Sequence, residues 1–222
     1  MLFRSFSIAT ASMPASGNPT IAHGLNANPD MLIFKSRTST ESWYISHKEL
    51  TNQSNRFLRF DTSAEITNSN WFNNTAPTSS VVTLRVGGGI SANNDVVIYS
   101  FSAVEGYSAM GSYTGNGSSD GPFVYTGFRP KWVMIKRYTT TGSWIMLDSE
   151  RNQYNLSNNK LAANSSAEEN NDSIVGSGDK NSLDFLSNGF KLRSGNGETN
   201  GSGAGFIYAV FAENPFKTAR AR

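Results

Sequence analysis

Hydrophobic and polar residues alternate along most of this chain, which is the pattern of β-strands that bury one face. Breakers rich in glycine and asparagine, such as Gly87–Gly89 and Gly195–Gly197, separate the alternating runs and close hairpins at low cost. The alternation predicts strands at Phe6–Thr10, Thr20–Gly24, Met31–Ser36, Ser42–His47, Phe57–Phe60, Val81–Val86, Val96–Val104, Ser112–Gly115, Phe123–Thr126, Trp132–Tyr138, Ser143–Leu147, Asp184–Leu186, Phe190–Arg193 and Gly205–Glu213. Short strands with such regular turn signals predict an all-β antiparallel sandwich of jelly-roll or concanavalin-like type.

Helical character is confined to one segment. Residues Asn158–Asn171 fit either one short helix or a loop over a sheet edge. The prediction of an all-β fold holds for both alternatives.

The chain also carries an internal repeat. Residues Pro29–Leu50 align with Pro130–Arg151 at a constant offset of 101, with seven identities in 22 aligned positions. The similarity extends to Gly24 against Gly127 and to Leu84 against Leu192. We therefore expect two packed copies of a β unit of about 105 residues. The predicted copies are residues 1–107 and 108–222, as two abutting sandwiches or as one fused sandwich.

The repeated motif predicts a shared arrangement of side chains in both copies. Two apolar residues face a core, the lysine that follows points outwards, and a tryptophan on the next strand closes the core. These residues are Leu32, Phe34, Lys35 and Trp43 in the first copy and Val133, Ile135, Lys136 and Trp144 in the second.

Composition narrows the class of function. The net charge is +2, only 16% of residues are charged, and the basic residues are scattered, so a nucleic-acid partner is not expected. The absence of cysteine excludes disulfides, thiolate metal sites and cysteine nucleophiles. The N-terminus lacks the pattern of a signal peptide and no apolar run approaches 18 residues, so membrane insertion is not expected. A surface of asparagine, serine, threonine and glycine suits a repetitive assembly or contact with carbohydrate.

Candidate catalytic and metal-binding residues are few. The only histidines, His23 and His47, are expected as exposed polar residues at strand ends, and no metal-ligand spacing surrounds them. A glycosidase needs two carboxylates that face one cleft, and the candidate pairs are Asp148 with Glu150 and Glu168 with Glu169. Such a pair is the minority interpretation of these surface acids. We therefore predict no enzyme activity, no catalytic residue, no metal and no cofactor.

Aromatic residues in polar segments are the candidates for ligand binding. They are Trp71, Phe72, Tyr125 and Tyr154, which have ring faces that can stack on sugars. Trp71 and Phe72 lie in the polar loop Asn68–Thr78 and are expected to be the most exposed. The alternative, that this loop folds its rings back over the sheet, is favoured on general grounds.

Four motifs together resemble a known family. They are GL…PDMLIFKSR…SWYI, YTGNG…TGFRPKWVMIKR…GSWIMLDS, FLSNGFKLR and the terminal FIYAVFAENPFK. They resemble an uncharacterised duplicated β domain of tailed bacteriophages, especially of marine and cyanobacterial hosts, found in tail-fibre-like and other virion structural proteins. The resemblance covers nearly the whole chain and brings no catalytic residues with it. It implies a virion component that is assembled in the bacterial cytoplasm.

Two functions fit this resemblance. The first is a tail-associated, fibre-type module for host attachment, which binds a surface glycan through aromatics and amides. The second is a capsid decoration (cement) protein, which grips neighbouring capsid subunits. In both cases the partners are other virion proteins, the chain needs no cofactor, and a homotrimer is expected. A polysaccharide depolymerase is the remote third alternative.

Overall fold

The computed structural model describes residues 5–50, 53–62, 67–68, 70–169 and 182–215. Within these ranges the chain is almost entirely β, and every paired strand runs antiparallel to its neighbour. The chain divides between Ala103 and Val104 into two compact units. The prediction of an all-β, antiparallel sandwich is therefore confirmed.

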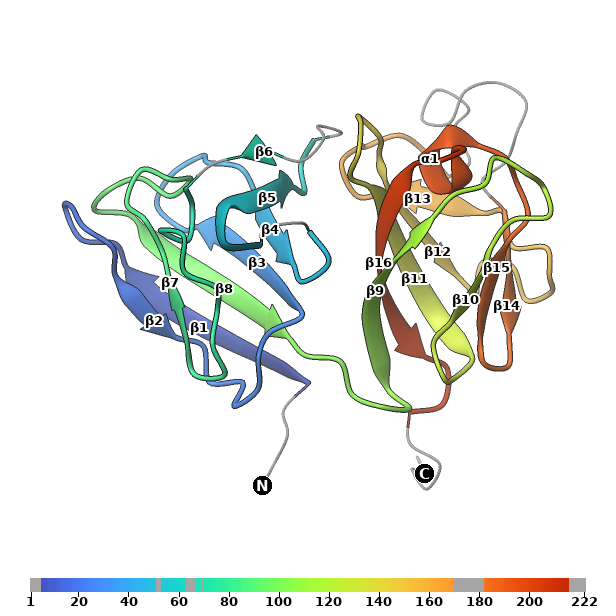
Figure 1. Cartoon of the computed structure of the whole chain (residues 1–222), viewed down its shortest axis with the longest axis horizontal. Coiled ribbons are helices and arrows are strands. Elements are labelled where there is room, and N and C mark those ends of the chain that lie inside the picture. The colour runs from blue at the N-terminus through green and yellow to red at the C-terminus, as the bar shows by residue number, and fades with distance from the viewer. Residues whose placement is uncertain (1–4, 51–52, 63–66, 69, 170–181, 216–222) are drawn as a thin grey trace. The chain divides into compact units, whose positions relative to one another are not determined.

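The first unit is built on a six-stranded sheet. Its strands follow the order β1 (Phe6–Ser12), β8 (Asp95–Phe101), β3 (Met31–Ser36), β4 (Tyr44–His47), β5 (Arg56–Arg59) and β6 (Thr67–Asn68). A short 3₁₀ turn, η1 (Gln53–Asn55), precedes β5. A second, two-stranded sheet pairs β2 (Thr20–Ala22) with β7 (Val81–Thr83) (Figure 1). The six-stranded sheet supplies most of the layer that faces the core.

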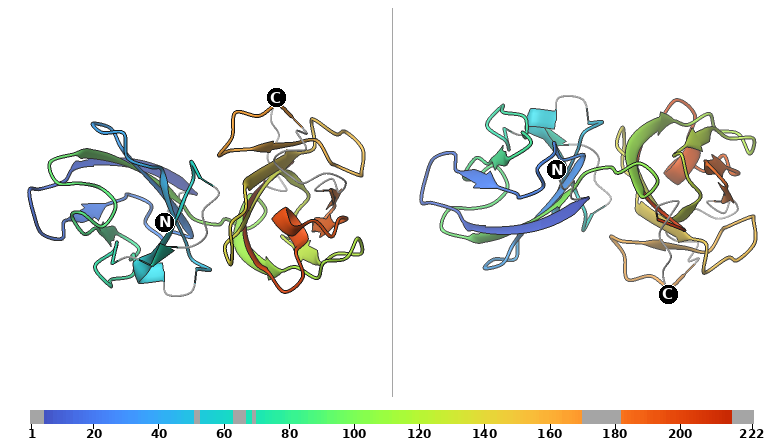
Figure 2. Two further views of the ribbon diagram at one scale, coloured as in Figure 1. Left: turned by 90° about the horizontal axis from the view of Figure 1, so that it is seen from above. Right: turned by 90° about the horizontal axis from the view of Figure 1, so that it is seen from below.

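The second unit has a five-stranded main sheet. Its strands follow the order β13 (Lys160–Ala162), β12 (Trp144–Asp148), β11 (Pro130–Arg137), β16 (Gly205–Ala212) and β9 (Ser108–Thr114). The smaller sheet contains β10 (Phe123–Tyr125), β15 (Gly189–Leu192) and β14 (Leu183–Leu186). The one α-helix of the described residues, α1 (Gly197–Asn200), precedes β16. In both views of Figure 2 the main sheet of this unit is curved.

The two units share one strand order. The order β1-β8-β3-β4-β5 in the first corresponds to β9-β16-β11-β12-β13 in the second, and the pair β2-β7 corresponds to β10-β15. The pairing register agrees as well: Met31 lies opposite His47, and Trp132 lies opposite Asp148, which preserves the offset of 101. Common order and common register are what a duplication predicts.

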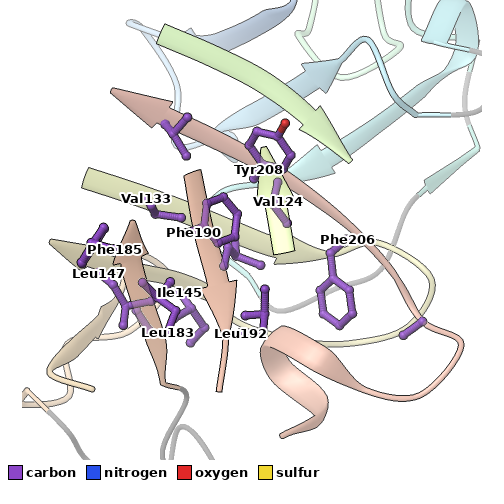
Figure 3. Packing of buried hydrophobic residues seen from close by; sticks show 14 of the residues in the cluster. Val124, Val133, Ile145, Leu147, Leu183, Phe185, Phe190, Leu192, Phe206 and Tyr208 are labelled. Atoms are coloured by element: carbon purple, nitrogen blue, oxygen red, sulfur yellow. The ribbon is translucent and has the colours of Figure 1, made fainter. Parts of the chain in front are cut away.

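The core of the second unit lies between its two sheets. Inward-facing residues of β11, β12 and β16 meet those of β10, β14 and β15, as period-two alternation requires (Figure 3). The buried side chains labelled there are Val124, Val133, Ile145, Leu147, Leu183, Phe185, Phe190, Leu192, Phe206 and Tyr208. Phe190 packs edge-on against both Tyr113 and Tyr208, with ring centroids 6.2 and 5.6 Å apart. Val133 and Ile135 face this core as the sequence predicts.

In the first unit, loop aromatics take the place of a missing third strand. Trp71 O accepts the amide of Arg85 (2.8 Å), as Ser182 O accepts the amide of Arg193 (2.8 Å) beside β14 in the second unit. The Trp71 ring packs among Phe34, Tyr44, Phe57 and Phe72, with centroid distances of 4.4 to 6.2 Å. A loop in the place of a strand must supply large side chains here, because among the described residues the second sheet has two strands to cover the core.

Glycine makes room for the Trp71 ring. A Cβ atom at Gly89 would lie 1.5 Å from the Trp71 ring, so only glycine allows the indole to pack there. The glycine triplet Gly87–Gly89 thus serves core packing in addition to turn formation.

Three sequence predictions about these elements are wrong or only partly right. Asn158–Asn171 contains the edge strand β13 and no helix in its described part, with 170 and 171 outside the described residues. Lys136 does not point to solvent, because it is completely buried, whereas Lys35 is half-buried. Neither tryptophan closes the core, because each lies on the outer face of its sheet beside the motif lysine; there Trp144 is buried and Trp43 is 37% exposed. The motif positions are equivalent, but the two units cover them differently.

One carboxylate in each unit ties the loop after the third strand to the loop before the last strand. In the first unit, Glu41 Oε1 accepts from Ser91 N (2.9 Å) and Asn94 Nδ2 (3.2 Å). In the second, the carboxylate comes from the opposite loop: Glu198 Oε2 accepts the amide of Ser143 (2.5 Å). Gly142 occupies the position of Glu41, and a Cβ there would lie 3.3 Å from Glu198 Oε2. Both units therefore join these two loops through a carboxylate. The carboxylate belongs to the earlier loop in the first unit and to the later loop in the second.

The Glu198 contact makes stability depend on pH. Burial raises the pKa of Glu198 above 4.5, although the Ser143 amide and Lys136 oppose the shift. The folded protein therefore holds this proton at pH values where the unfolded chain has released it, so stability falls as pH rises from 4.5 through the folded pKa. We expect Glu198→Gln to lose this fall in urea denaturation measured between pH 4 and 8. The matched Glu41→Gln variant should keep it, and an unchanged slope in Glu198→Gln would contradict the assignment.

Candidate functional site

The four aromatic residues predicted as ligand contacts do not form one site. Trp71 and Phe72 are 2% and 0% exposed, so the prediction that they are surface residues is wrong and the alternative of a folded-back loop holds. Tyr125 on β10 and Tyr154 in the loop after β12 are exposed, at 67% and 84%. No ring contact joins Tyr125 to Tyr154 in the part of the chain that the structure describes.

Both histidines are buried, contrary to the prediction that they are exposed at strand ends. The Nδ1 atom of His23 accepts the amide of Leu25, and that of His47 accepts the amide of Glu49, both at 3.2 Å. The Nε2 atom of His23 lies 3.0 Å from Thr78 O. Both rings are 1% exposed, and each closes a local turn through its Nδ1 atom.

The candidate carboxylates are engaged in turns and ion pairs. Asp148 Oδ1 accepts the amides of Glu150 (3.0 Å) and Arg151 (2.9 Å), and the Glu150 side chain pairs with Lys131. Glu169 pairs with Arg151 at 3.6 Å. No group of three or more histidine, aspartate or glutamate side chains is placed to hold a metal ion within the described ranges. Among these residues, no helix has the length and apolar character to cross a membrane.

The outer face of the six-stranded sheet carries a different aromatic cluster. Register places Phe6 opposite Phe101, and Ile8 opposite Tyr99, with all four side chains on the face away from the core. We call Phe6, Trp43, Tyr99 and Phe101, together with Lys35, the aromatic platform. Phe6 and Trp43 are 42% and 37% exposed, so the rings at both ends of the row are open to solvent.

Three rings of the platform are nearly parallel, whereas the Phe101 ring is tilted by 40° from that of Phe6. The Phe6 and Tyr99 rings lie within 14° of parallel with centroids 6.5 Å apart, and the Trp43 and Tyr99 rings lie within 23° at 6.4 Å. The Lys35 ammonium lies 6.0 Å from the Trp43 ring centroid and donates a hydrogen bond to Glu41 O. The platform thus combines apolar ring faces with one fixed positive charge.

A polar hollow lies on the same face, beside the cross-strand row that contains Thr10, Val97 and Lys35. It has a volume of about 240 Å³ and is lined by Thr10, Ala11, Ser12, Arg37 and Asp95. Ser12 Oγ donates to Asp95 Oδ1 (2.6 Å), which fixes the carboxylate. Arg37 supplies donors and Asp95 an acceptor, which together match the neighbouring hydroxyls of a sugar.

Residues 4–215 match a protein family described as a domain of unknown function (DUF7483). The chain belongs to this family. No curated protein and no solved structure matches the chain. The match spans both units of this DUF7483 domain, including the platform and the hollow.

The equivalent face of the second unit of the DUF7483 domain is closed. By register, Trp144 takes the place of Trp43, Lys136 that of Lys35, and Met110 that of Ile8. Trp144 and Met110 are 1% and 4% exposed, and Lys136 donates to Gly142 O (2.5 Å) where Lys35 donates to Glu41 O. The equivalent positions of the two units therefore differ in exposure, and of these three pairs only the residues of the first unit reach solvent.

The two equivalent tryptophans offer a direct test of this difference. We expect Trp144→Ala to lower the free energy of unfolding by about 3–5 kcal/mol, because it leaves a cavity in a closed face. Trp43→Ala should cost only about 1 kcal/mol, from its stacking and cation–π contacts. Urea denaturation of both variants measures the difference. Equal losses in the free energy of unfolding would mean that Trp43 contributes as much to stability as Trp144 and would contradict this difference.

Proposed function

We propose that this protein is a non-enzymatic component of the bacteriophage particle surface, of the tail-associated type that attaches to the host. In this proposal the aromatic platform binds a glycan of the cell surface. The family resemblance of the sequence motifs supports a virion component, and the exposed, aligned rings of Phe6, Tyr99 and Trp43 support the glycan. The ring alignment is the observation that carries the proposal.

The chemistry of sugars fits this surface. A pyranose ring has an apolar C–H face that stacks on an aromatic ring, while its hydroxyls need donors and acceptors at the rim. The platform supplies the ring faces, and Arg37 and Asp95 in the hollow supply a donor and an acceptor. Other aromatic side chains are exposed elsewhere, but Tyr125 and Tyr154 are not part of this aligned row.

Capsid decoration is the second candidate, and one observation favours it. Between the rings of the platform the same face carries aliphatic residues, including Ile8, Ile33 and Val97. Ile8 is 57% exposed, and an apolar face of this kind also suits contact with another protein. In this alternative the platform docks onto a neighbouring capsid subunit, and the chain is present throughout the lattice.

The proposal includes no cofactor and no catalytic step. Asp148, which belonged to the depolymerase alternative, is engaged in the turn at Glu150 and Arg151. The proposed partners are other virion proteins and a host glycan, and the proposed location is the virion.

Binding to host polysaccharide tests the platform. We expect the purified protein to bind host cells or a glycan array saturably, and Trp43→Ala to weaken binding at least tenfold, which corresponds to about 1.4 kcal/mol. Tyr99→Ala should have a similar effect. Tyr154→Ala is the matched control, because Tyr154 is 84% exposed and lies outside the platform. Loss of binding in Tyr154→Ala with retention in Trp43→Ala would refute the platform as the site.

Copy number separates attachment from decoration. We expect quantitative mass spectrometry of purified virions to give a few to a few dozen copies per particle, as for a tail component. Hundreds of copies would assign the protein to the capsid lattice and replace the first candidate with the second.

The depolymerase alternative has its own test. We expect neither the unaltered chain nor Asp148→Asn to cleave host polysaccharide. Cleavage that depends on Asp148 would establish the depolymerase.

A further inference from the structure

Strand β1 presents a free backbone edge. It lies at the end of the six-stranded sheet, and among the described residues its strand partner is β8 alone. The Met13 amide donates to Asn94 O (2.8 Å), and the Ser102 amide donates to Ser5 O (3.0 Å). Hydrogen-bonded and non-hydrogen-bonded pairs alternate in an antiparallel ladder, so odd-numbered residues of β1 bond to β8. The N–H and C=O groups that point outward belong to Phe6, Ile8, Thr10 and Ser12.

This edge lacks the usual protection against pairing. Natural edge strands carry charges, proline or bulges that prevent another strand from adding to the sheet. From Phe6 to Ser12 the sequence FSIATAS has no charged residue and no proline, and its register with β8 runs without a shift. The main-sheet edge of the second unit differs, because β9 is buried over most of its first half and β13 carries Lys160.

We propose that two copies of this chain pair antiparallel through β1 about a two-fold axis at Ala9. Residue Phe6 of one copy then lies opposite Ser12 of the other, and Ile8 lies opposite Thr10. Each of these is a hydrogen-bonded pair, so the junction holds about eight backbone hydrogen bonds, and Ala9 faces Ala9 in a non-hydrogen-bonded pair. The strand is complementary to itself because no like charges meet and small residues lie at the axis.

The pairing completes the binding face of each copy. Ser12 lines the polar hollow, and Phe6 of the second copy lies directly across from it on the same face of the joined sheet. That ring becomes a wall of the hollow, so the hollow gains the aromatic surface that its own residues lack. This role of Phe6 rests on the proposed glycan binding, whereas the pairing itself does not.

The arrangement also changes the expected oligomer. The sequence resemblance predicts a trimer. A strand edge that pairs with the same edge of a second copy has no free backbone groups left for a third chain. The proposed assembly is therefore a dimer with one continuous sheet and two binding faces. Two faces on one particle component raise the effective concentration of each binding event for a polymeric ligand.

The mass of the full chain in solution tests the pairing. We expect light scattering after size-exclusion chromatography to give twice 24.1 kDa for the unaltered chain and 24.1 kDa for Ile8→Lys. Thr114→Lys, an exposed position on the other main-sheet edge strand β9, is the matched control and should remain dimeric. A single-chain mass at every concentration, three times that mass, or a dimer unaffected by Ile8→Lys would overturn the proposal.

A cysteine cross-link keeps the test valid if Ile8→Lys does not fold. The chain contains no cysteine, so Ala9→Cys introduces a single thiol. The Cα atoms of a non-hydrogen-bonded pair lie about 4.5 Å apart, which is within the range of a disulfide. Mild oxidation should give a covalent dimer for Ala9→Cys and none for Ala76→Cys, an exposed loop position of the same unit. No cross-link at Ala9, or equal cross-linking at Ala76, would overturn the pairing.

Binding measurements separate the two proposals. A dimer that binds no glycan retains the pairing and overturns the proposed function. A monomer that binds glycan does the reverse. Where both hold, Ile8→Lys should weaken binding to a single-site oligosaccharide severalfold, because the hollow loses Phe6 of the second copy. Unchanged binding by the monomeric variant would overturn the role of Phe6 across the junction.

Discussion

Burial of one face of the main sheet beneath a smaller second sheet is the interaction on which each unit depends. Strand β3 in the first unit and β11 in the second lie between two antiparallel neighbours, and their alternate side chains enter the core. These alternate apolar side chains stabilise the fold only if a second layer excludes water from the face on which they lie. Pairing order, turn glycines and loop aromatics all serve to place that layer.

The second layer is built in two ways. In the second unit a three-stranded sheet covers the core and contributes Phe185 and Phe190, whereas the described part of the first unit has a two-stranded sheet and Trp71 with Phe72 completes the cover. The Trp71 ring requires glycine at position 89. A loop can therefore cover the core in place of a strand if it buries large side chains and keeps the backbone hydrogen bond to the neighbouring segment.

A sheet has two faces, and the second layer covers only one of them. The outer face is apolar in both units, but it is closed around Trp144 and Lys136 in the second and open around Trp43 and Lys35 in the first. Buried Lys136 is tolerated because its ammonium group donates a hydrogen bond to Gly142 O. The open face of the first unit joins aligned rings, a polar hollow and a free strand edge on one surface, and this combination suits a protein whose role is contact.

The sequence by itself determined the all-β class and the core-facing positions Leu32, Phe34, Val133 and Ile135. These features follow from local periodicity and from the repeat, both of which are properties of neighbouring residues. Only the tertiary structure decided the exposure of Trp43 against Trp144, of Trp71 and Phe72, and of His23 and His47. Exposure depends on what lies above a residue, and an alternating pattern says which side chains share a face without saying whether that face is covered. The platform was missed for this reason: Phe6 on β1, Tyr99 on β8 and Trp43 just before β4 are far apart in the sequence, and their alignment arises only when the sheet forms.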